Sequence, residues 1–393
     1  MVDDRFAVFV VFALNGAVYG SWAPRVPAIA ARLDARPGSL GLTLLCLTIG
    51  MLIAAALSGR LVERVGARAA IVVATLLSGV VLPLLGVAAT APWLALVMFG
   101  LGATVGLLDV AMNIGAVGVE RRTGRPLMPV FHAGYSFGGL VASSAAGLAA
   151  AHQWTPLRHF LVAAVLVAVA LLLVLRGLPK SVPQEHGDTS GARVTPIRRP
   201  VLWLLAAIAL CSAIAEGASA DWSALLLVSA HNIGQGAAAL AYAGFSLTMA
   251  LTRLAGAWVQ RRLGATRTLV LGAVLAGAGL VVAAVVPVAV VAFAGFGLAG
   301  AGLAASFPIA LSLAGASGKR VDDTGGEREI AFVTTIAYSG FLVGPPMFGG
   351  IAQVTSLSTS FVVVGLLAAL IAPAAVGAGR ARHRELTVPR PVF

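Results

Sequence analysis

Two acidic side chains lie in the middle of long apolar stretches, where an ionised group is costly to bury. Asp109 falls within a glycine-rich run and is followed one helical turn later by Asn113. Residues three and four apart share one face of a helix, so these two side chains project together with Gly102 and Gly106. Glu216 occupies a similar position in a second apolar run. An ionisable residue in the middle of an apolar stretch is usually functional. The alternative interpretation is that each of the two acids forms a structural hydrogen bond between helices.

Other polar side chains repeat at helical spacing in further apolar stretches. Such stripes are costly against lipid but not against a water-filled cavity. We therefore expect a polar cavity, and a carboxyl group that lines it can bind and release a proton during transport. The expected proton-coupling residues are Asp109, Glu216 and His132. The residues expected to line a substrate cavity are Asn15, Tyr19, Trp22, Asn113, Ser136, Ser212, Ser219, Tyr242, Ser246, Arg253, Ser306 and Tyr338.

Three polar residues near these stripes allow two interpretations each. His132 is either a proton relay or a residue of the inner surface. Arg253 pairs either with a carboxylate or with an anionic group of the substrate. Asp221 lies on the opposite helix face from the serines that accompany Glu216, and it either takes a direct role or forms an interfacial ion pair with Arg25.

Membrane-spanning helices are the elements expected to position these residues. The chain has 393 residues, of which 59% are hydrophobic and 11% charged, whereas a soluble domain carries roughly 25% charged residues. A span needs about 20 mostly apolar residues, and polar or Pro/Gly punctuation separates twelve such stretches. Trp22 and Trp222 lie toward the ends of two stretches, where aromatic residues are also common for interfacial reasons alone. The expected spans are Phe6–Ile29, Ser39–Ser58, Ala69–Ala88, Trp93–Gly118, Val130–Ala151, Arg158–Leu175, Val201–Ser229, Ile233–Trp258, Thr268–Val286, Pro287–Gly315, Ala331–Thr355 and Thr359–Gly379.

One long polar interruption divides the spans into two sets of six. Its Ser, Gly and Pro content is typical of a flexible linker. The sequence thus predicts an all-α membrane protein with twelve transmembrane helices in two pseudo-symmetric six-helix bundles. The expected divisions are an N-terminal bundle (1–176), a cytoplasmic linker (177–200), a C-terminal bundle (201–379) and a cytoplasmic basic tail (380–393).

The two sets of spans resemble each other in sequence. The segment Gly59–Gly66 matches Ala257–Gly264 at an offset of 198, and Tyr135-Ser136 matches Tyr338-Ser339. Spans 3, 6, 9 and 12 have no ionised residue in their middle, whereas spans 4, 7 and 8 hold the deeply placed charges. Weak repeats of this kind are typical of a transporter built from two halves around a central path. The spans without charges are expected to face lipid.

The distribution of basic residues predicts the orientation in the membrane. With the N-terminus inside, 22 of the 27 Lys and Arg residues fall on the inner side and 4 on the outer side. This imbalance predicts a multi-pass protein of the cytoplasmic membrane with both termini in the cytoplasm. The net charge of +12 therefore reflects membrane topology rather than nucleic-acid binding.

Motifs for other chemistries are weak or lacking in the sequence. Gly134–Gly138 fits the nucleophile-elbow pattern, but it lies inside an apolar helix instead of a strand–turn–helix unit. Cys46 and Cys211 suggest neither a disulfide framework nor a metal site. We expect no enzyme activity, cofactor or metal. The expected partners are a small-molecule substrate, protons and the lipid bilayer, and the protein is expected to act as a monomer.

The segment Gly59-Arg-Leu-Val-Glu-Arg-Val-Gly-Ala-Arg68 resembles the loop between spans 2 and 3 of the major facilitator superfamily, with glutamate in place of the usual aspartate. In that family the loop latches the two halves together on the cytoplasmic side. The resemblance implies that Gly59 permits close helix approach and that Glu63 and Arg64 form interhelical charge contacts. The implied latch residues are Gly59, Glu63, Arg64, Gly66 and Arg68.

Within the superfamily, the chain resembles the fucose-permease-like branch and the rhizopine-cluster (Mos-type) membrane proteins. In fucose-type symporters an acidic residue on span 4, followed four residues later by asparagine, takes part in proton coupling; Asp109 and Asn113 match this pattern. The second carboxylate that such permeases carry on span 1 has no counterpart, so the resemblance suggests Glu216 as its substitute. The motifs carrying the branch resemblance are Ser21–Arg25, Asp109–Asn113, His132–Ser136, Glu216–Trp222, Phe307-Pro308 and Phe341–Pro346.

The leading interpretation is a secondary active transporter that works by alternating access. It would move a small polar solute, such as a sugar, polyol or related amine, coupled to protons. One alternative is a proton-driven exporter of drugs or metabolites, which the many Ala, Leu and Val residues favour. Another is a polytopic membrane enzyme or sensor. The substrate, the direction of transport and the stoichiometry are open at this point.

Overall fold

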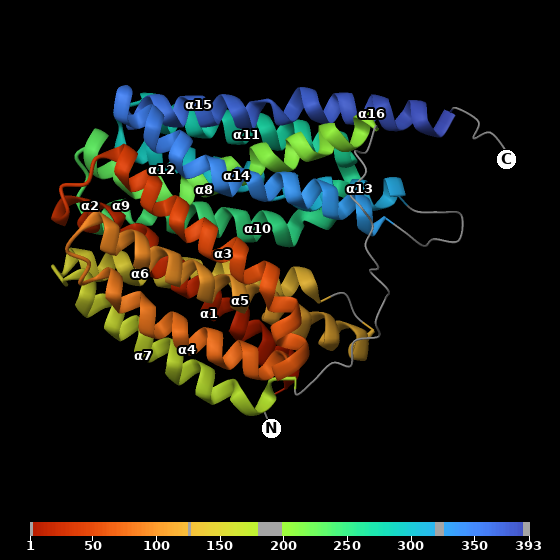
Figure 1. Cartoon of the computed structure of the whole chain (residues 1–393). Helices are drawn as coiled ribbons and strands as arrows, with labels where there is room; N and C mark the ends of the chain where they lie inside the picture. Colours follow the sequence, from red (N-terminus) through yellow and green to blue (C-terminus); the bar gives the residue numbers. More distant parts are fainter. Residues whose placement is uncertain (1–2, 125–126, 180–198, 319–325, 388–393) are drawn as a thin grey trace.

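The computed structural model describes residues 3–124, 127–179, 199–318 and 326–387, and the regular structure in these ranges is entirely helical. The first half of the chain supplies six spans, which can be followed in Figure 1. The first span is α1 (Asp4–Trp22), which continues through the 3-10 turn η1 (Ala23–Arg25) into α2 (Val26–Arg32). The others are α3 (Pro37–Val65), α4 (Ala67–Leu85), α5 (Ala91–Thr123), α6 (Met128–Ala151) and α7 (Pro156–Val174).

The second half repeats this plan, with three of its spans broken into two helices. The unbroken spans are α8 (Pro200–Ala230), α11 (Ala265–Val285) and α14 (Glu327–Val354). The broken spans are α9 (Gln235–Ala238) with α10 (Leu240–Leu263), α12 (Ala289–Leu303) with α13 (Ser306–Gly318), and α15 (Leu357–Ala369) with α16 (Ile371–Thr387).

In the described part of the chain, eleven spans are long and apolar enough to cross a membrane. The exception is α6, which has 24 residues but carries His132, Tyr135 and several glycines and serines. It packs mainly against α1 and α10. The structure confirms the expected all-helical membrane class. The last helix, α16, continues past residue 380 to Thr387, into the segment expected as a basic tail. Most of the expected linker lies outside the described residues.

Two glycines at equivalent turns show the repeat in backbone geometry. Gly66 joins α3 to α4 with φ 83° and ψ 150°, and Gly264 joins α10 to α11 with φ 75° and ψ 163°. Side chains are strained at such positive φ values, so glycine permits both sharp turns. The sequence offset of 198 therefore marks the same structural element in each half.

The helices form two halves that meet along a small number of helices (Figure 1). The first half is held together chiefly by α3–α5, α1–α6 and α4–α5 packing, and the second by α11–α12, α8–α14 and α10–α12 packing. The halves contact each other through α3 with α14, α6 with α10, and α8 with η1 and α2. We call one end of the molecule the termini side; it holds the α3–α4 turn, the α10–α11 turn and the end of α16. The opposite end, where α2 and α9 lie, is the far side.

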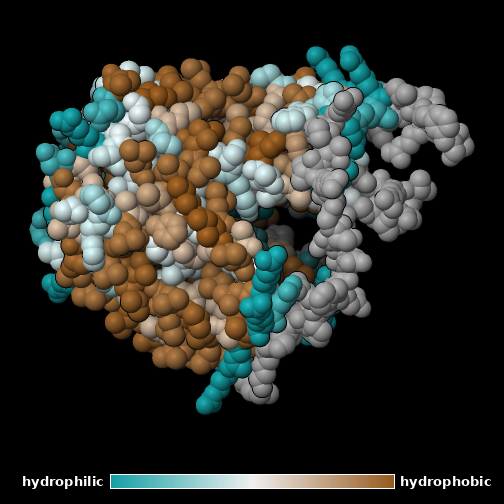
Figure 2. All heavy atoms as spheres, in the orientation of Figure 1, coloured by the Kyte–Doolittle hydropathy of each residue, from teal (hydrophilic) through white to brown (hydrophobic). Residues whose placement is uncertain are grey.

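Close helix packing explains the glycines beside Asp109. A Cβ atom at Gly102 would overlap the carbonyl oxygen of Leu47 on α3, and one at Gly106 would overlap that of Met51. These two glycines therefore face α3 and bring its backbone against α5. The outer surface is largely apolar, as expected for helices in contact with lipid (Figure 2).

Candidate functional site

An ion pair within the second half lies next to polar groups of the first half. The Nη2 atom of Arg253 on α10 is 3.7 Å from Oε1 of Glu216 on α8, and their side chains are 24% and 31% exposed. Arg253 Nη1 also donates a hydrogen bond of 3.5 Å to the Ser136 hydroxyl of α6. His132, one turn earlier on α6, is exposed and interacts electrostatically with Arg253. Arg253 thus connects both halves.

Asp109 and Asn113 form a second polar group on α5. The Asn113 amide donates to the Asp109 backbone oxygen at 2.8 Å and lies 3.5 Å from its carboxylate. Both side chains are half-buried. Asp109 interacts electrostatically with Tyr135 on α6 and with Tyr338 on α14 of the other half, and none of the ion pairs in the described part of the chain includes it.

Tyr135 links the two charged groups. Its side chain lies near Asp109, Glu216, Arg253 and Tyr242. Tyr135 was not among the expected site residues. The repeat of the Tyr135-Ser136 pair at Tyr338-Ser339 is the sequence signal that could have identified it. The polar region is thus made of side chains from α5, α6, α8, α10 and α14.

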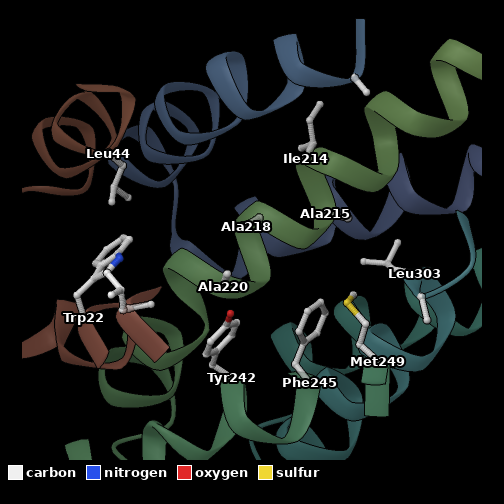
Figure 3. Close-up of a cluster of buried hydrophobic side chains, with 14 of the residues drawn as sticks. Trp22, Leu44, Ile214, Ala215, Ala218, Ala220, Tyr242, Phe245, Met249 and Leu303 are labelled. Carbon is white, nitrogen blue, oxygen red and sulfur yellow. The ribbon is translucent and has the colours of Figure 1, made fainter. Parts of the chain in front are cut away.

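An aromatic cluster lies on the far side of this region. The Tyr19 hydroxyl of α1 donates a hydrogen bond to the carboxylate of Asp221 on α8, which joins the two halves. The Tyr19 ring lies 5.2 Å from that of Trp22 and 6.0 Å from that of Tyr242. Figure 3 shows Tyr242 projecting from α10 toward Ala220 on α8.

Of the two interpretations of Asp221, which is only 7% exposed, the ion pair with Arg25 does not occur in the described part of the chain. Instead, a guanidinium nitrogen of Arg25 donates to the Trp154 carbonyl oxygen. The reason is that α1 continues through η1, which directs Arg25 toward the α6–α7 turn.

Further contacts between the halves close the far side. The Thr48 hydroxyl donates to the Phe341 carbonyl oxygen at 3.1 Å, and the Gly38 amide donates to the Gln353 side chain at 3.2 Å. A Cβ atom at Gly41 would lie 3.2 Å from the Gly349 Cα atom, so α3 and α14 approach closely there. Toward the termini side, by contrast, the surface is hollowed between the halves (Figure 2). The two halves are therefore in close contact on the far side and separated toward the termini side.

Several residues expected to line the cavity are buried in helix packing in this conformation. Ser219 donates to its own helix at the Ala215 oxygen, and the Asn15 amide contacts the Met112 sulfur at 3.6 Å. The buried hydroxyls of Ser212 and Ser306 have no hydrogen-bond partner among the described residues. The buried members of the expected set, all 6% exposed or less, are Asn15, Trp22, Ser136, Ser212, Ser219, Tyr242, Ser246 and Ser306. The more exposed members are Tyr19, Asn113, Arg253 and Tyr338.

The implied latch residues lie on the open termini side. A Cβ atom at Gly59 would meet no atom of the described residues within 4 Å, so none of the described helices approaches it closely in this conformation. Glu63 and Arg64 take part in none of the ion pairs of the described residues. Gly66 has a definite role, because its positive φ forms the α3–α4 turn. A latch at Gly59, Glu63, Arg64 and Arg68 stays a prediction for a conformation in which this side is closed.

No group of three or more His, Cys, Asp or Glu side chains suited to a metal ion occurs among the described residues. The polar region instead offers hydroxyls, an amide, an imidazole and carboxylates. These groups suit hydrogen bonding to a polar solute and proton binding.

Solved membrane transporters share this architecture. A bacterial homolog of the human lysosomal transporter Spinster, in an inward-facing and occupied conformation, aligns over 99% of this chain and 98% of its own, with 14% identity and a TM-score of 0.75. A D323A mutant of the nucleoside transporter NupG aligns over 96% of this chain and 100% of its own, with 13% identity and a TM-score of 0.79. The fold is thus that of a multi-pass membrane transporter.

Sequence comparison identifies the family. The model of the Major Facilitator Superfamily matches residues 8–314. An uncharacterized MFS-type transporter of Yersinia pestis is 33% identical over 374 residues, covering 95% of each chain. An uncharacterized transporter, y4wD, of Sinorhizobium fredii is 35% identical over 361 residues (92% of this chain and 94% of its own), and the membrane protein MosC of Rhizobium meliloti is 28% identical over 380 residues (96% and 91%). The chain belongs to the Major Facilitator Superfamily, and it is a secondary transporter and not an enzyme.

Proposed function

We propose that this transporter moves a small polar solute, such as a sugar, a polyol or a related amine, and that protons drive the movement through Asp109. The observation that carries the proposal is the setting of Asp109. Its carboxyl is half-buried, has Asn113 beside it, forms no ion pair among the described residues and interacts with Tyr338 of the other half. A carboxyl without a fixed counter-ion can change its protonation state without breaking a salt bridge.

The groups of the polar region would take different roles. Asp109 would bind the proton, and the tyrosines and Asn113 would hydrogen-bond the solute. The Glu216–Arg253 pair, 3.7 Å apart and partly exposed, would exchange partners as the solute enters. This division matches the resemblance to fucose-type symporters, where a carboxylate and an asparagine one turn apart on span 4 take part in coupling.

We further propose that the termini side faces the cytoplasm. The excess of Lys and Arg residues on that side supports this orientation. In that case the structure is the inward-facing state, with the site open to the cytoplasm. Rocking of the halves would break the far-side contacts and bring the latch segment around Gly59 toward the other half.

A ligand screen followed by two transport assays tests the coupling role. Thermal unfolding of the purified protein with sugars, polyols, amines, nucleosides and amino acids identifies a solute that stabilises it. In proteoliposomes, Asp109→Asn should then abolish accumulation driven by a proton gradient while leaving counterflow exchange of the same solute. Asp34→Asn is the matched control, because Asp34 is exposed, has φ 47°, and asparagine tolerates that conformation.

Two results would redirect the proposal. Undiminished accumulation by Asp109→Asn would exclude Asp109 as the coupling residue. Proton-driven efflux of a lipophilic cation, with no stabilising sugar, polyol or amine, would favour the alternative of a drug or metabolite exporter, which the predominance of Ala, Leu and Val supports.

A further inference from the structure

The tenth span is broken between α12 and α13, at Ala304 and Ala305, and Pro308 follows the break. In a continuous helix the N–H group of residue 308 would donate to the carbonyl oxygen of Ala304. Proline has no N–H group, and its ring crowds the carbonyl group four residues earlier. The break therefore leaves the Ala304 carbonyl oxygen available to a donor from another helix.

Arg253 on α10 supplies that donor. Its Nε atom donates to the Ala304 oxygen at 3.5 Å, while Nη1 donates to Ser136 at 3.5 Å and Nη2 lies 3.7 Å from Glu216. All three distances are long, so no single partner fixes the guanidinium group. Ser136 belongs to the other half and Glu216 is a titratable side chain, whereas the Ala304 oxygen is a backbone atom of the same half. The Ala304 oxygen is therefore the partner whose position and charge vary least.

The break also lies where the tenth span changes its packing partners. Before the break, α12 packs chiefly against α11 and α10, whereas after it α13 packs chiefly against α8 and α14. A Cβ atom at Gly300 would lie 2.2 Å from the Phe245 carbonyl oxygen, so α12 is in backbone contact with α10. Ala304 is only 1% exposed. The contact between Arg253 and Ala304 therefore joins two segments that are packed tightly against each other.

We propose that Pro308 is a positioning residue of the transport site. By withholding the N–H group that would occupy the Ala304 oxygen, it reserves this oxygen for Arg253 and keeps the guanidinium between Glu216 and Ser136. The break also ends α12 beside Arg253, and the C-terminal end of a helix favours a cation. The inference rests on the proposed role of the polar region in transport, but the position of Arg253 can be measured without any solute.

Chemical modification of arginine in the full-length protein in detergent measures this position. Phenylglyoxal reacts with accessible guanidinium groups, and mass spectrometry of proteolytic peptides gives the rate at Arg253. Pro308→Ala restores the backbone donor and removes no buried side chain, because Pro308 is exposed. We expect the rate at Arg253 to rise roughly two- to tenfold, the factor that corresponds to one lost hydrogen bond. An unchanged rate at Arg253 would overturn the assignment.

Two controls separate a local effect from a general loosening of the protein. Arg64 is exposed on the termini side, and its rate should be the same in Pro308→Ala as in the unsubstituted chain. Pro373 follows a similar break between α15 and α16 and is also exposed, but the residues around it (366–376) are all apolar. Pro373→Ala should leave the rate at Arg253 unchanged. An equal rise in both proline variants would contradict the proposal.

Thermal unfolding separates the Arg253 contact from the straightening of the helix. Proline is the poorest helix former, so Pro308→Ala should raise the unfolding temperature, and the lost contact with Arg253 should reduce this rise. In the Arg253→Gln background there is no such contact to lose, so Pro308→Ala should raise the unfolding temperature by a larger amount. Pro373→Ala should give equal shifts in both backgrounds. Equal shifts for Pro308→Ala as well would show that Pro308 does not act through Arg253.

A second substitution decides the question if Pro308→Ala does not fold. Pro308→Gly restores the same N–H group with a weaker preference for the helix. The rate of phenylglyoxal modification at Arg253 should rise in this variant too. A rate equal to that of the unsubstituted chain would overturn the assignment.

Discussion

Removing the Tyr19 hydroxyl should shift the protein toward a conformation in which the far side is open. This hydroxyl donates to the buried carboxylate of Asp221 and joins α1 to α8 across the seam. A hydrogen bond to a charged group contributes about 1.5–3 kcal/mol, which corresponds to roughly a 10- to 150-fold change in an equilibrium constant. When the far side opens, water can solvate the carboxylate, so Tyr19→Phe destabilises the closed state selectively.

Cysteine labelling measures this shift. The two native cysteines, Cys46 and Cys211, are replaced by serine, and one reporter cysteine is added on each side of the site. Leu44→Cys reports on the far side, because Leu44 is 2% exposed, and His132→Cys reports on the exposed termini side. Tyr19→Phe should speed maleimide labelling at the first reporter and slow it at the second.

The control variant is Tyr338→Phe, which removes a hydroxyl from the open side of the same region. It should leave labelling at the Leu44→Cys reporter unchanged. Unaltered labelling in Tyr19→Phe, or an equal change in both variants, would refute the view that the Tyr19–Asp221 bond holds the far side closed.

Three further predictions follow from the packing and the charges. In a double-mutant cycle of unfolding free energies, Glu216→Gln and Arg253→Gln should show a coupling of only about 0.5–1 kcal/mol, because both side chains are partly exposed; a coupling of several kcal/mol would contradict this. Gly102→Leu should reduce the yield of folded protein in size-exclusion chromatography, because the side chain would overlap the α3 backbone. Gly59→Leu should leave the yield of folded protein unchanged. It should reduce the rate of transport if the latch closes at Gly59. Gly264→Ala should lower the unfolding free energy by about 1 kcal/mol, since φ is 75°, and unchanged denaturant unfolding would argue against strain at that turn.

The architecture could be predicted from the sequence because hydrophobicity and length determine where a helix can cross a bilayer. The chain still differs from the expectation at span ends. The expected span Phe6–Ile29 is divided by the 3-10 turn η1, which contains Pro24 and is followed by Pro27 in α2. Likewise, α16 continues through the basic residues that suggested a tail, because arginine is a good helix former.

The site was less accessible to sequence reasoning, because periodicity assigns residues to a helix face but not to a partner on another helix. It gave no means of pairing Tyr19 with Asp221, which are 202 residues apart. Periodicity also grouped Ser212 and Ser219 with Glu216. In the structure the two serines are buried between helices, whereas the Glu216 carboxylate is partly exposed.

Proton flux measured together with solute flux tests the central claim most directly. Proteoliposomes that contain a trapped pH indicator and no imposed gradient receive a pulse of the stabilising solute found in the screen. Proton-coupled transport through Asp109 predicts that the solute carries protons with it, so the indicator reports a pH change with the unsubstituted protein and none with Asp109→Asn, although both variants exchange the solute. Solute uptake without proton movement, or the same pH change in Asp109→Asn, would contradict the account.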